Sequence, residues 1–301
     1  MGKMGFFIGI AVFLILLGLF FIFVPVVKQA PEYQYQETKE LVTFVTEAAD
    51  YIQQKGEGAF TEFEKEGGPW RYGNFYIFVF DTEGNMLVHP NPGLIGKNVI
   101  DLKDANGKPF IRVLIKEVIR RYRNKEGAWF HYFWNVPGSI FPKWKTSFMR
   151  LVVSPSGKKY VVGSGLYNMR MEKAFIVSLV DNAGELIEHE GRSAFTQLRD
   201  KAGDFIFMDA YVFVDTPDGV ELVNPAFPDV EGKNLMGYKD STGKFVVREY
   251  IGLALKKGKG WVSYLWPKPG EIAPSRKYSY VKKVKYRNET FIVGSGVYLT
   301  P

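Results

Sequence analysis

The sequence predicts an α+β protein in which an N-terminal transmembrane helix precedes two tandem modules, each an antiparallel sheet with a long helix in front of it. Three observations predict this fold class. An uncharged apolar run opens the chain, one sequence pattern then occurs twice, and each occurrence alternates hydrophobic spacing typical of helices with spacing typical of strands. The predicted segments are 1–30 for the membrane helix, 31–170 for the first module and 171–301 for the second.

The apolar run covers residues 5–27 and is about as long as the 20 residues a helix needs to cross a bilayer core. A secretory signal peptide would have a shorter apolar stretch and a small-x-small cleavage site, and KQAP at residues 28–31 is a poor site. The run is therefore predicted to remain as a single-pass anchor in the inner or plasma membrane. Lysines lie on both sides of it, so the charges say little about its orientation.

The composition excludes several classes of function. The 301 residues carry a net charge of +7, but Lys and Arg are interspersed with Asp and Glu, which argues against nucleic-acid binding. Cysteine is absent and there are only three histidines, none at metal-ligand spacing, so the sequence predicts no metal site and no cofactor. Nucleophile-elbow, P-loop and zinc-protease motifs are also absent from the sequence, so we expect no catalytic residues and no enzyme.

The rest of the chain is a duplication. Residues 55–79 align without gaps with residues 190–214, and four later motifs recur in the same order. These are HPNPGLIGKN at 89–98 with NPAFPDVEGKN at 224–234, KDANGKPFIR at 103–112 with KDSTGKFVVR at 239–248, HYFWNVPG at 131–138 with SYLWPKPG at 263–270, and VVGSGLY at 161–167 with IVGSGVY at 292–298.

Each copy predicts the same order of elements. A long amphipathic helix is followed by a strand, a glycine turn and a second short strand, then by a loop, a second helix and three closing strands. The expected ranges are 37–54 and 172–189 for the first helices, 76–80 and 211–215 for the first strands, 109–122 and 245–257 for the second helices, and 129–134, 147–153 and 160–163 for the closing strands of the first copy.

Repeated polar and aromatic residues are candidates for binding a ligand. Arg112 and Arg248 open the second helix of each copy, where a cation is unfavourable next to the helix dipole, so either a guanidinium directed at a carboxylate or a surface salt bridge explains them. Lys143 and Lys277 each precede an aromatic residue and suit an anionic ligand, although a loop lysine is often simply solvated. His89 matches Asn224, and both can hydrogen-bond an anion or the backbone.

Strand aromatics and glycines complete the set. Tyr132 and Trp134 lie two apart and share one face of a strand, as do Tyr264 and Trp266, and that face is either a pocket wall or core. The repeated G-x-G ends a strand and is not followed by a helix, which indicates backbone geometry and not a phosphate loop.

These motifs resemble those of the Cache superfamily, in the double form built from the second Cache type. The resemblance covers roughly residues 37–298 and rests on the HP or NP, the GKN, the D-x-x-G, the Y-x-W-x-x-P and the G-x-G-x-Y, each present twice. It implies PAS-like modules outside the cytoplasm, after about residue 30, whose sheets bind a small molecule such as a carboxylate or an amino acid. The implied function is a sensor for chemotaxis or signal transduction.

The resemblance also bears on partners. The sequence shows no kinase or methyl-accepting segment after the last motif, so we expect a separate signalling kinase, chemoreceptor or transporter to receive the signal. A homodimer formed through the N-terminal helices is compatible with this arrangement. The alternative interpretation is a structural or interaction stalk whose ligand pockets have degenerated.

Overall fold

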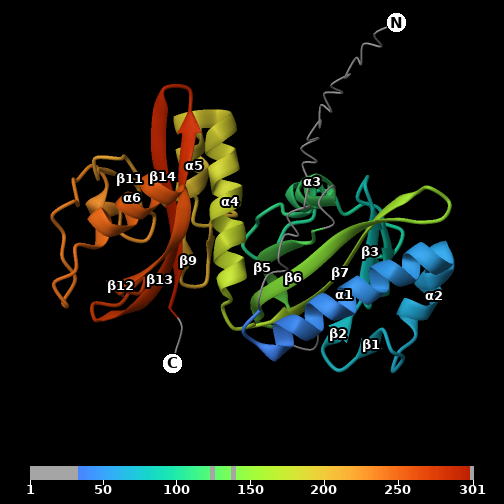
Figure 1. Cartoon of the computed structure of the whole chain (residues 1–301). Coiled ribbons are helices and arrows are strands. Elements are labelled where there is room, and N and C mark those ends of the chain that lie inside the picture. The colour runs from blue at the N-terminus through green and yellow to red at the C-terminus, as the bar shows by residue number, and fades with distance from the viewer. Residues whose placement is uncertain (1–32, 123–125, 137–139, 299–301) are drawn as a thin grey trace, which may run out of the picture. The chain divides into compact units, whose positions relative to one another are not determined.

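The computed structural model describes residues 33–122, 126–136 and 140–298 (Figure 1). The predicted membrane helix at residues 5–27 lies outside these ranges. Across the described ranges, no helix combines the length and the apolar character that crossing a membrane requires.

The first module contains a five-stranded antiparallel sheet with the strand order β4-β3-β7-β6-β5. Its elements are α1 (Gln36–Lys55), α2 (Ala59–Glu64), β1 (Arg71–Tyr72), β2 (Phe75–Tyr76), β3 (Phe78–Asp81), β4 (Met86–Val88), α3 (Ile111–Tyr122), β5 (Ala128–Asn135), β6 (Pro142–Val153) and β7 (Lys159–Tyr167).

The second module repeats this topology, with the strand order β11-β10-β14-β13-β12. Its elements are α4 (Lys173–Glu190), α5 (Ala194–Arg199), β8 (Ile206–Phe207), β9 (Ala210–Tyr211), β10 (Phe213–Asp215), β11 (Glu221–Val223), α6 (Val246–Lys257), β12 (Lys259–Pro267), β13 (Pro274–Tyr286) and β14 (Glu289–Val297). Two sheet-containing modules, each preceded by a long helix, are therefore present as the duplication predicts.

Each sheet is covered by a long helix on one face and a short helix on the other. In the first module, α1 packs on β6 and β7, and α3 packs on β5 and β6. Strand alternation produces the two layers, because Ile77 and Val79 join the core under α1 whereas Phe78 and Phe80 join the core under α3. In the second module α4 and α6 flank β13 in the same way (Figure 1). In the first module, the face of the sheet under α3 also contains a small cavity.

One detail of the predicted strands is wrong. The expected strand 76–80 is interrupted at Ile77, and its first part, β2, pairs with β1 in a separate two-stranded sheet. Residues 206–211 form the equivalent hairpin in the second module. Strands of two residues give no hydrophobic period, so alternation could not reveal them.

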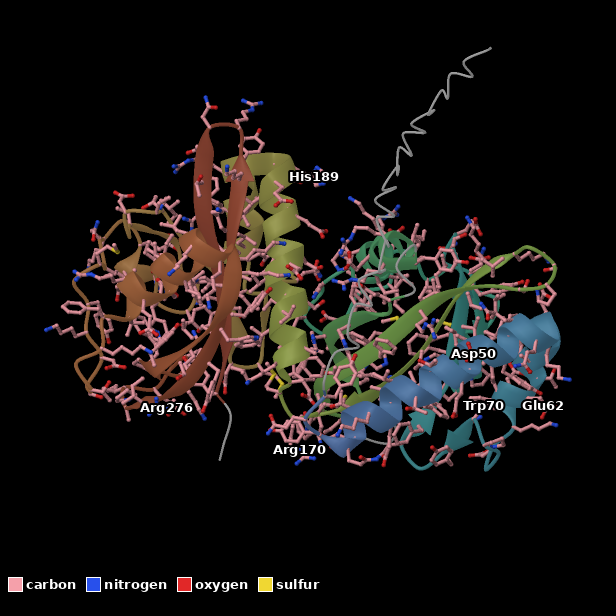
Figure 2. All side chains as sticks on the ribbon, viewed as in Figure 1. Asp50, Glu62, Trp70, Arg170, His189 and Arg276 are labelled. Carbon is pink, nitrogen blue, oxygen red and sulfur yellow. The ribbon has the colours of Figure 1, made fainter. Side chains whose placement is uncertain are left out.

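The start of α1 is tied to the segment that joins the modules. The buried carboxylate of Glu172 accepts backbone N–H groups from Gln34, at 3.0 Å, and from Tyr35, at 2.8 Å. Arg170, labelled beside the start of α1 in Figure 2, donates its side-chain Nε–H and its backbone N–H to Glu37. Two chain segments far apart in sequence are thus joined at the point where the described chain begins.

Replacing Glu172 with alanine is expected to lower the free energy of unfolding by about 2–4 kcal/mol, because two backbone donors lose a buried charged acceptor. Glu37→Ala is the matched control, since its ion pair with Arg170 is largely exposed and contributes less than about 1 kcal/mol. Denaturant unfolding of the full chain in detergent measures both changes. Equal losses for the two variants would contradict a structural role for Glu172.

Candidate functional site

A small cavity lies between the sheet and α3 of the first module. We call it the inner cavity. Its volume is about 30 Å³. This is room for about two water molecules or for one carboxylate group. It is mostly apolar, with three polar side chains. The lining consists of Phe78, Phe80, Met86, His89, Leu94, Leu102, Phe110, Ile111, Leu114, Tyr132, Trp134 and Lys145.

Lys145 is the charged group of the inner cavity. It lies on β6, its side chain is only 2% exposed, and its Nζ donates to the hydroxyl of Tyr76 and lies 4.4 Å from the centre of that ring. Burial lowers the pKa of Lys145 to about 7, because the ammonium has lost its hydration. Among the described residues, no carboxylate forms an ion pair or a hydrogen bond with this ammonium.

Tyrosine and serine hydroxyls surround the lysine. Tyr132 lies opposite Lys145 in the β5–β6 ladder, and its hydroxyl is 2.8 Å from Ser147 Oγ. The ring of Phe110 stacks on Tyr132 at 4.4 Å between centroids and holds it in place. Burial raises the pKa of Tyr76 to about 12, so the hydroxyl of Tyr76 stays protonated and available as a donor.

His89 adds a neutral donor. Its Nδ1 accepts the backbone N–H of Asn91 at 2.9 Å, so the neutral ring carries its proton on Nε2. Burial, together with the nearby positive charge of Lys145, lowers the pKa of His89 to about 4. The imidazole therefore remains uncharged at neutral pH, and the charge of the site comes from Lys145.

A wider depression, which we call the outer cleft, adjoins the inner cavity and shares His89, Leu94 and Trp134 with it. Its volume is about 730 Å³. Arg71 lines the outer cleft with a side chain that is 30% exposed and 3.9 Å from Glu66. A ligand in the inner cavity therefore has an opening to solvent beside a second cation.

The repeated G-x-G makes room for this site. A Cβ at Gly165 would lie 2.9 Å from Lys145 Cε and would collide with Ser147 Oγ, and a Cβ at Gly163 would lie 2.7 Å from the ring of Phe78. Neither glycine has positive φ. The motif is thus not a phosphate loop, and it serves to seat the lysine and an aromatic ring on the neighbouring strands.

The structure brings together three of the residues predicted for the first module, His89, Tyr132 and Trp134, which all line the inner cavity. Lys143 lies opposite Trp134 at the exposed end of β6 and is absent from that lining. Arg112 is also absent from it, because its guanidinium pairs with Asp101 at 2.9 Å on the surface, where the two side chains are 68% and 81% exposed. Its contact matches the surface salt-bridge interpretation.

In the second module the predicted residues Asn224, Tyr264 and Lys277 are buried, and Trp266 packs against the same core. The Nζ of Lys277 donates to Tyr211 Oη at 2.9 Å. The exposed guanidinium of Arg248 lies 4.3 Å from the ring of Phe245, outside this core. The two arginines therefore stay on the surface in both copies.

Sequence reasoning missed Lys145, although a signal for it was present. Lys145 follows Trp134 by 11 residues, as Lys277 follows Trp266, and each lysine is followed two residues later by a serine. Lys143 shares only the neighbouring aromatic with Lys277, so equal spacing from the tryptophan would have selected Lys145. Tyr76 and Tyr211 also match in the ungapped alignment of the two copies.

Comparison with known proteins agrees with this architecture. Residues 27–174 match the family model described as Single Cache domain 2, and residues 181–300 match the one described as Cache domain.

Two relatives and one solved structure are similar to parts of the chain. The methyl-accepting chemotaxis protein McpP of Pseudomonas putida is 34% identical over 91 residues, which are 30% of this chain and 16% of that protein. The sensor histidine kinase MctS of Rhizobium johnstonii is 36% identical over 111 residues, 36% of this chain and 22% of that protein. A solved Cache chemosensory domain, described for its recognition of carboxylic acids, is 27% identical, with a TM-score of 0.38, over 42% of this chain and 93% of that one.

The matched segments thus span less than a quarter of the two relatives' own lengths. The two family models, by contrast, cover both modules, one model to each module. The chain therefore belongs to the Cache family of sensor domains, in its double form.

Proposed function

We propose that the first module binds a short monocarboxylate at Lys145, and that the protein is the ligand-binding part of an extracytoplasmic sensor. One observation carries the proposal. An ammonium is buried in the inner cavity with no described carboxylate to balance it, and a buried charge costs free energy unless it acquires a partner. An anionic ligand supplies that partner.

The remaining lining restricts the class of ligand. His89 in the lining and Tyr76 beside Lys145, in the wall of the outer cleft, offer neutral hydrogen-bond donors for carboxylate oxygens, and most of the remaining inner wall is aromatic and aliphatic. None of the described residues that line the inner cavity is a carboxylate, so the ammonium group of an amino acid would find no counter-charge among them. The inner cavity has room for the carboxylate group itself, and acetate and propionate are the simplest members of the class with which to test it.

The wider biological setting follows from the family and the sequence. Cache domains are sensing modules of chemoreceptors and sensor kinases, and the apolar run at residues 5–27 would anchor this one in the membrane. In this proposal, residues 31–170 form the binding module, residues 171–301 form a second module, and a kinase, chemoreceptor or transporter receives the signal. Dimerisation through the N-terminal helices would bring two binding modules together.

Acetate and propionate are expected to bind the full chain in detergent and to raise its thermal unfolding midpoint, whereas acetamide and propionamide of the same shape do not. Below about pH 7 Lys145 already carries its proton and the affinity should be constant. Above about pH 7 the free protein must take up a proton to bind, so the affinity should fall about tenfold per pH unit.

Calorimetric titration on both sides of pH 7 measures this dependence. Equal shifts by acids and amides, or an affinity that does not change across pH 7, would contradict binding at Lys145. A shift with none of these compounds would favour the alternative of an interaction stalk.

A further inference from the structure

The second module contains the same lysine seat as the first. The side chain of Lys277 is 1% exposed, and a Cβ at Gly296 would collide with its Cε and would also clash with Ser279. Tyr264 lies opposite Lys277 in the β12–β13 ladder, and its hydroxyl is 2.7 Å from Ser279 Oγ. Lysine, tyrosine, serine and glycine thus have the same arrangement in both copies.

Strand register shows which residues differ around this seat. Phe78 pairs with Gly163 as Phe213 pairs with Gly294, so Asp215 occupies the place of Phe80. The partner of Asp215 on the next strand is Glu221, as Met86 is the partner of Phe80, and both pairs follow the same irregularity in register. The repeated motif before the second helix sets Tyr250 in the place of Leu114. All three apolar residues replaced here line the inner cavity of the first module.

The two introduced carboxyl groups face each other in a closed interior. Asp215 is 0% exposed and Glu221 is 3% exposed. Tyr250 Oη donates to Asp215 Oδ2 at 2.8 Å, and Asn224 Nδ2 donates to Glu221 Oε1 at 2.8 Å. No donor among the described residues reaches Asp215 Oδ1. Two ionised carboxylates offer only acceptors to each other, whereas a single shared proton supplies the missing donor.

Among the described residues, the titratable groups that interact with this carboxyl pair are one cation and three phenols. Lys277 attracts the charge of Glu221 from β13, and Tyr250, Tyr264 and Tyr211 approach from α6, β12 and β9. Burial raises the pKa of all three tyrosines, so they remain neutral. One proton on the carboxyl pair leaves a single negative charge in the interior, which attracts Lys277 and partly offsets the effect of burial, which lowers the pKa of that lysine to about 7.

We infer that Asp215 and Glu221 form a proton-binding site whose remaining negative charge attracts Lys277. In the first module the two corresponding strand positions are the apolar Phe80 and Met86, so Lys145 has no such neighbour among the described residues. The comparison between the copies rests on the proposed function, whereas the proton-binding site itself does not depend on any ligand.

The effect of burial on the pKa values of the two carboxyl groups agrees with this geometry. Burial raises the pKa of Asp215 to about 7 and raises that of Glu221 well above its usual range. Because a raised carboxyl pKa stabilises the fold at low pH, this stabilisation is lost as the pH rises through about 7. The pair titrates as a unit, since two carboxyl groups on paired, buried strand positions cannot both ionise freely.

Infrared spectroscopy of the full chain in detergent, with no ligand added, tests the site. At about pH 6 an ordinary carboxyl group, with a pKa near 4, is ionised. The wild type is expected to retain the band of a protonated carboxyl group, and the double variant Asp215→Asn/Glu221→Gln is expected to lose it. Glu249→Gln, which changes an exposed glutamate on α6 of the same module, is expected to keep it.

Thermal unfolding gives a second measurement in case one variant folds poorly. The unfolding midpoint of the wild type should fall relative to that of Asp215→Asn as the pH rises through about 7. Absence of the protonated band in the wild type, its persistence in the double variant, or a midpoint difference that is constant with pH would overturn the proposal. Since no ligand enters these measurements, their failure is distinguishable from failure of carboxylate binding by the first module.

Discussion

Lys145→Met is expected to weaken binding of acetate or propionate by at least about 100-fold and, at the same time, to make the unliganded protein more stable. Methionine fills a similar volume but removes the ammonium, and a hydrogen-bonded charge contributes about 3 kcal/mol to binding its counter-ion. Calorimetric titration of the variant measures the loss. Lys143→Met is the matched control, because Lys143 lies on the same strand with its side chain in solvent.

The gain in stability has a definite pH dependence. Burial lowers the pKa of Lys145 in the folded protein from its ordinary value of 10.5 to about 7. The free energy of unfolding of the wild type therefore decreases as the pH falls from about 10.5 through about 7. Methionine has no proton to bind, so the variant should exceed the wild type by about 2–4 kcal/mol near pH 7 and by less at alkaline pH. A variant that loses stability together with binding would indicate that Lys145 is structural.

Met86→Glu is expected to abolish carboxylate binding by providing the first module with an internal counter-ion. Residue 86 lines the inner cavity and corresponds in strand register to Glu221, whose carboxyl group attracts Lys277 in the second module. A glutamate there would balance the charge of Lys145 and repel the carboxylate group of the ligand. We expect the loss of affinity to reach at least about 100-fold, comparable to that of removing the cation.

Met86→Gln distinguishes the effect of a negative charge at residue 86 from the effect of the size of the new side chain. Glutamine matches glutamate in size but leaves the ammonium of Lys145 unbalanced, so the variant should retain affinity within about tenfold of the wild type. Calorimetric titration of both variants with propionate provides the comparison. If the two variants bind equally weakly, the size of the side chain and not its charge blocks the site, and the argument from the second module fails.

Much of the fold could be predicted because the chain contains it twice. The helical and strand periods and the matched motifs located two modules with a long helix before each sheet. The shared face of Tyr132 and Trp134 was predicted, but the sequence left open whether it is core or the pocket wall that these residues line. Lys145 could have been identified by its spacing from Trp134, which equals that of Lys277 from Trp266. The aromatic residue next to Lys143 pointed to the wrong lysine. The opposing carboxyl groups could not be predicted, because nothing in the local sequence FVD or ELV distinguishes a buried acid from one at a strand end.

The glycine at residue 165 has a consequence for reading related sequences. Its missing side chain is the space in which the stem of Lys145 lies, with Ser147 on the adjoining strand. A relative could therefore retain every polar residue of the pocket and still be unable to hold the ammonium, if a single methyl group had been added at this position. Judged by its charged residues alone, such a protein would be classed as a receptor for anions. The replacement of the glycine equivalent to Gly165 would instead identify it as a protein that has lost its ligand.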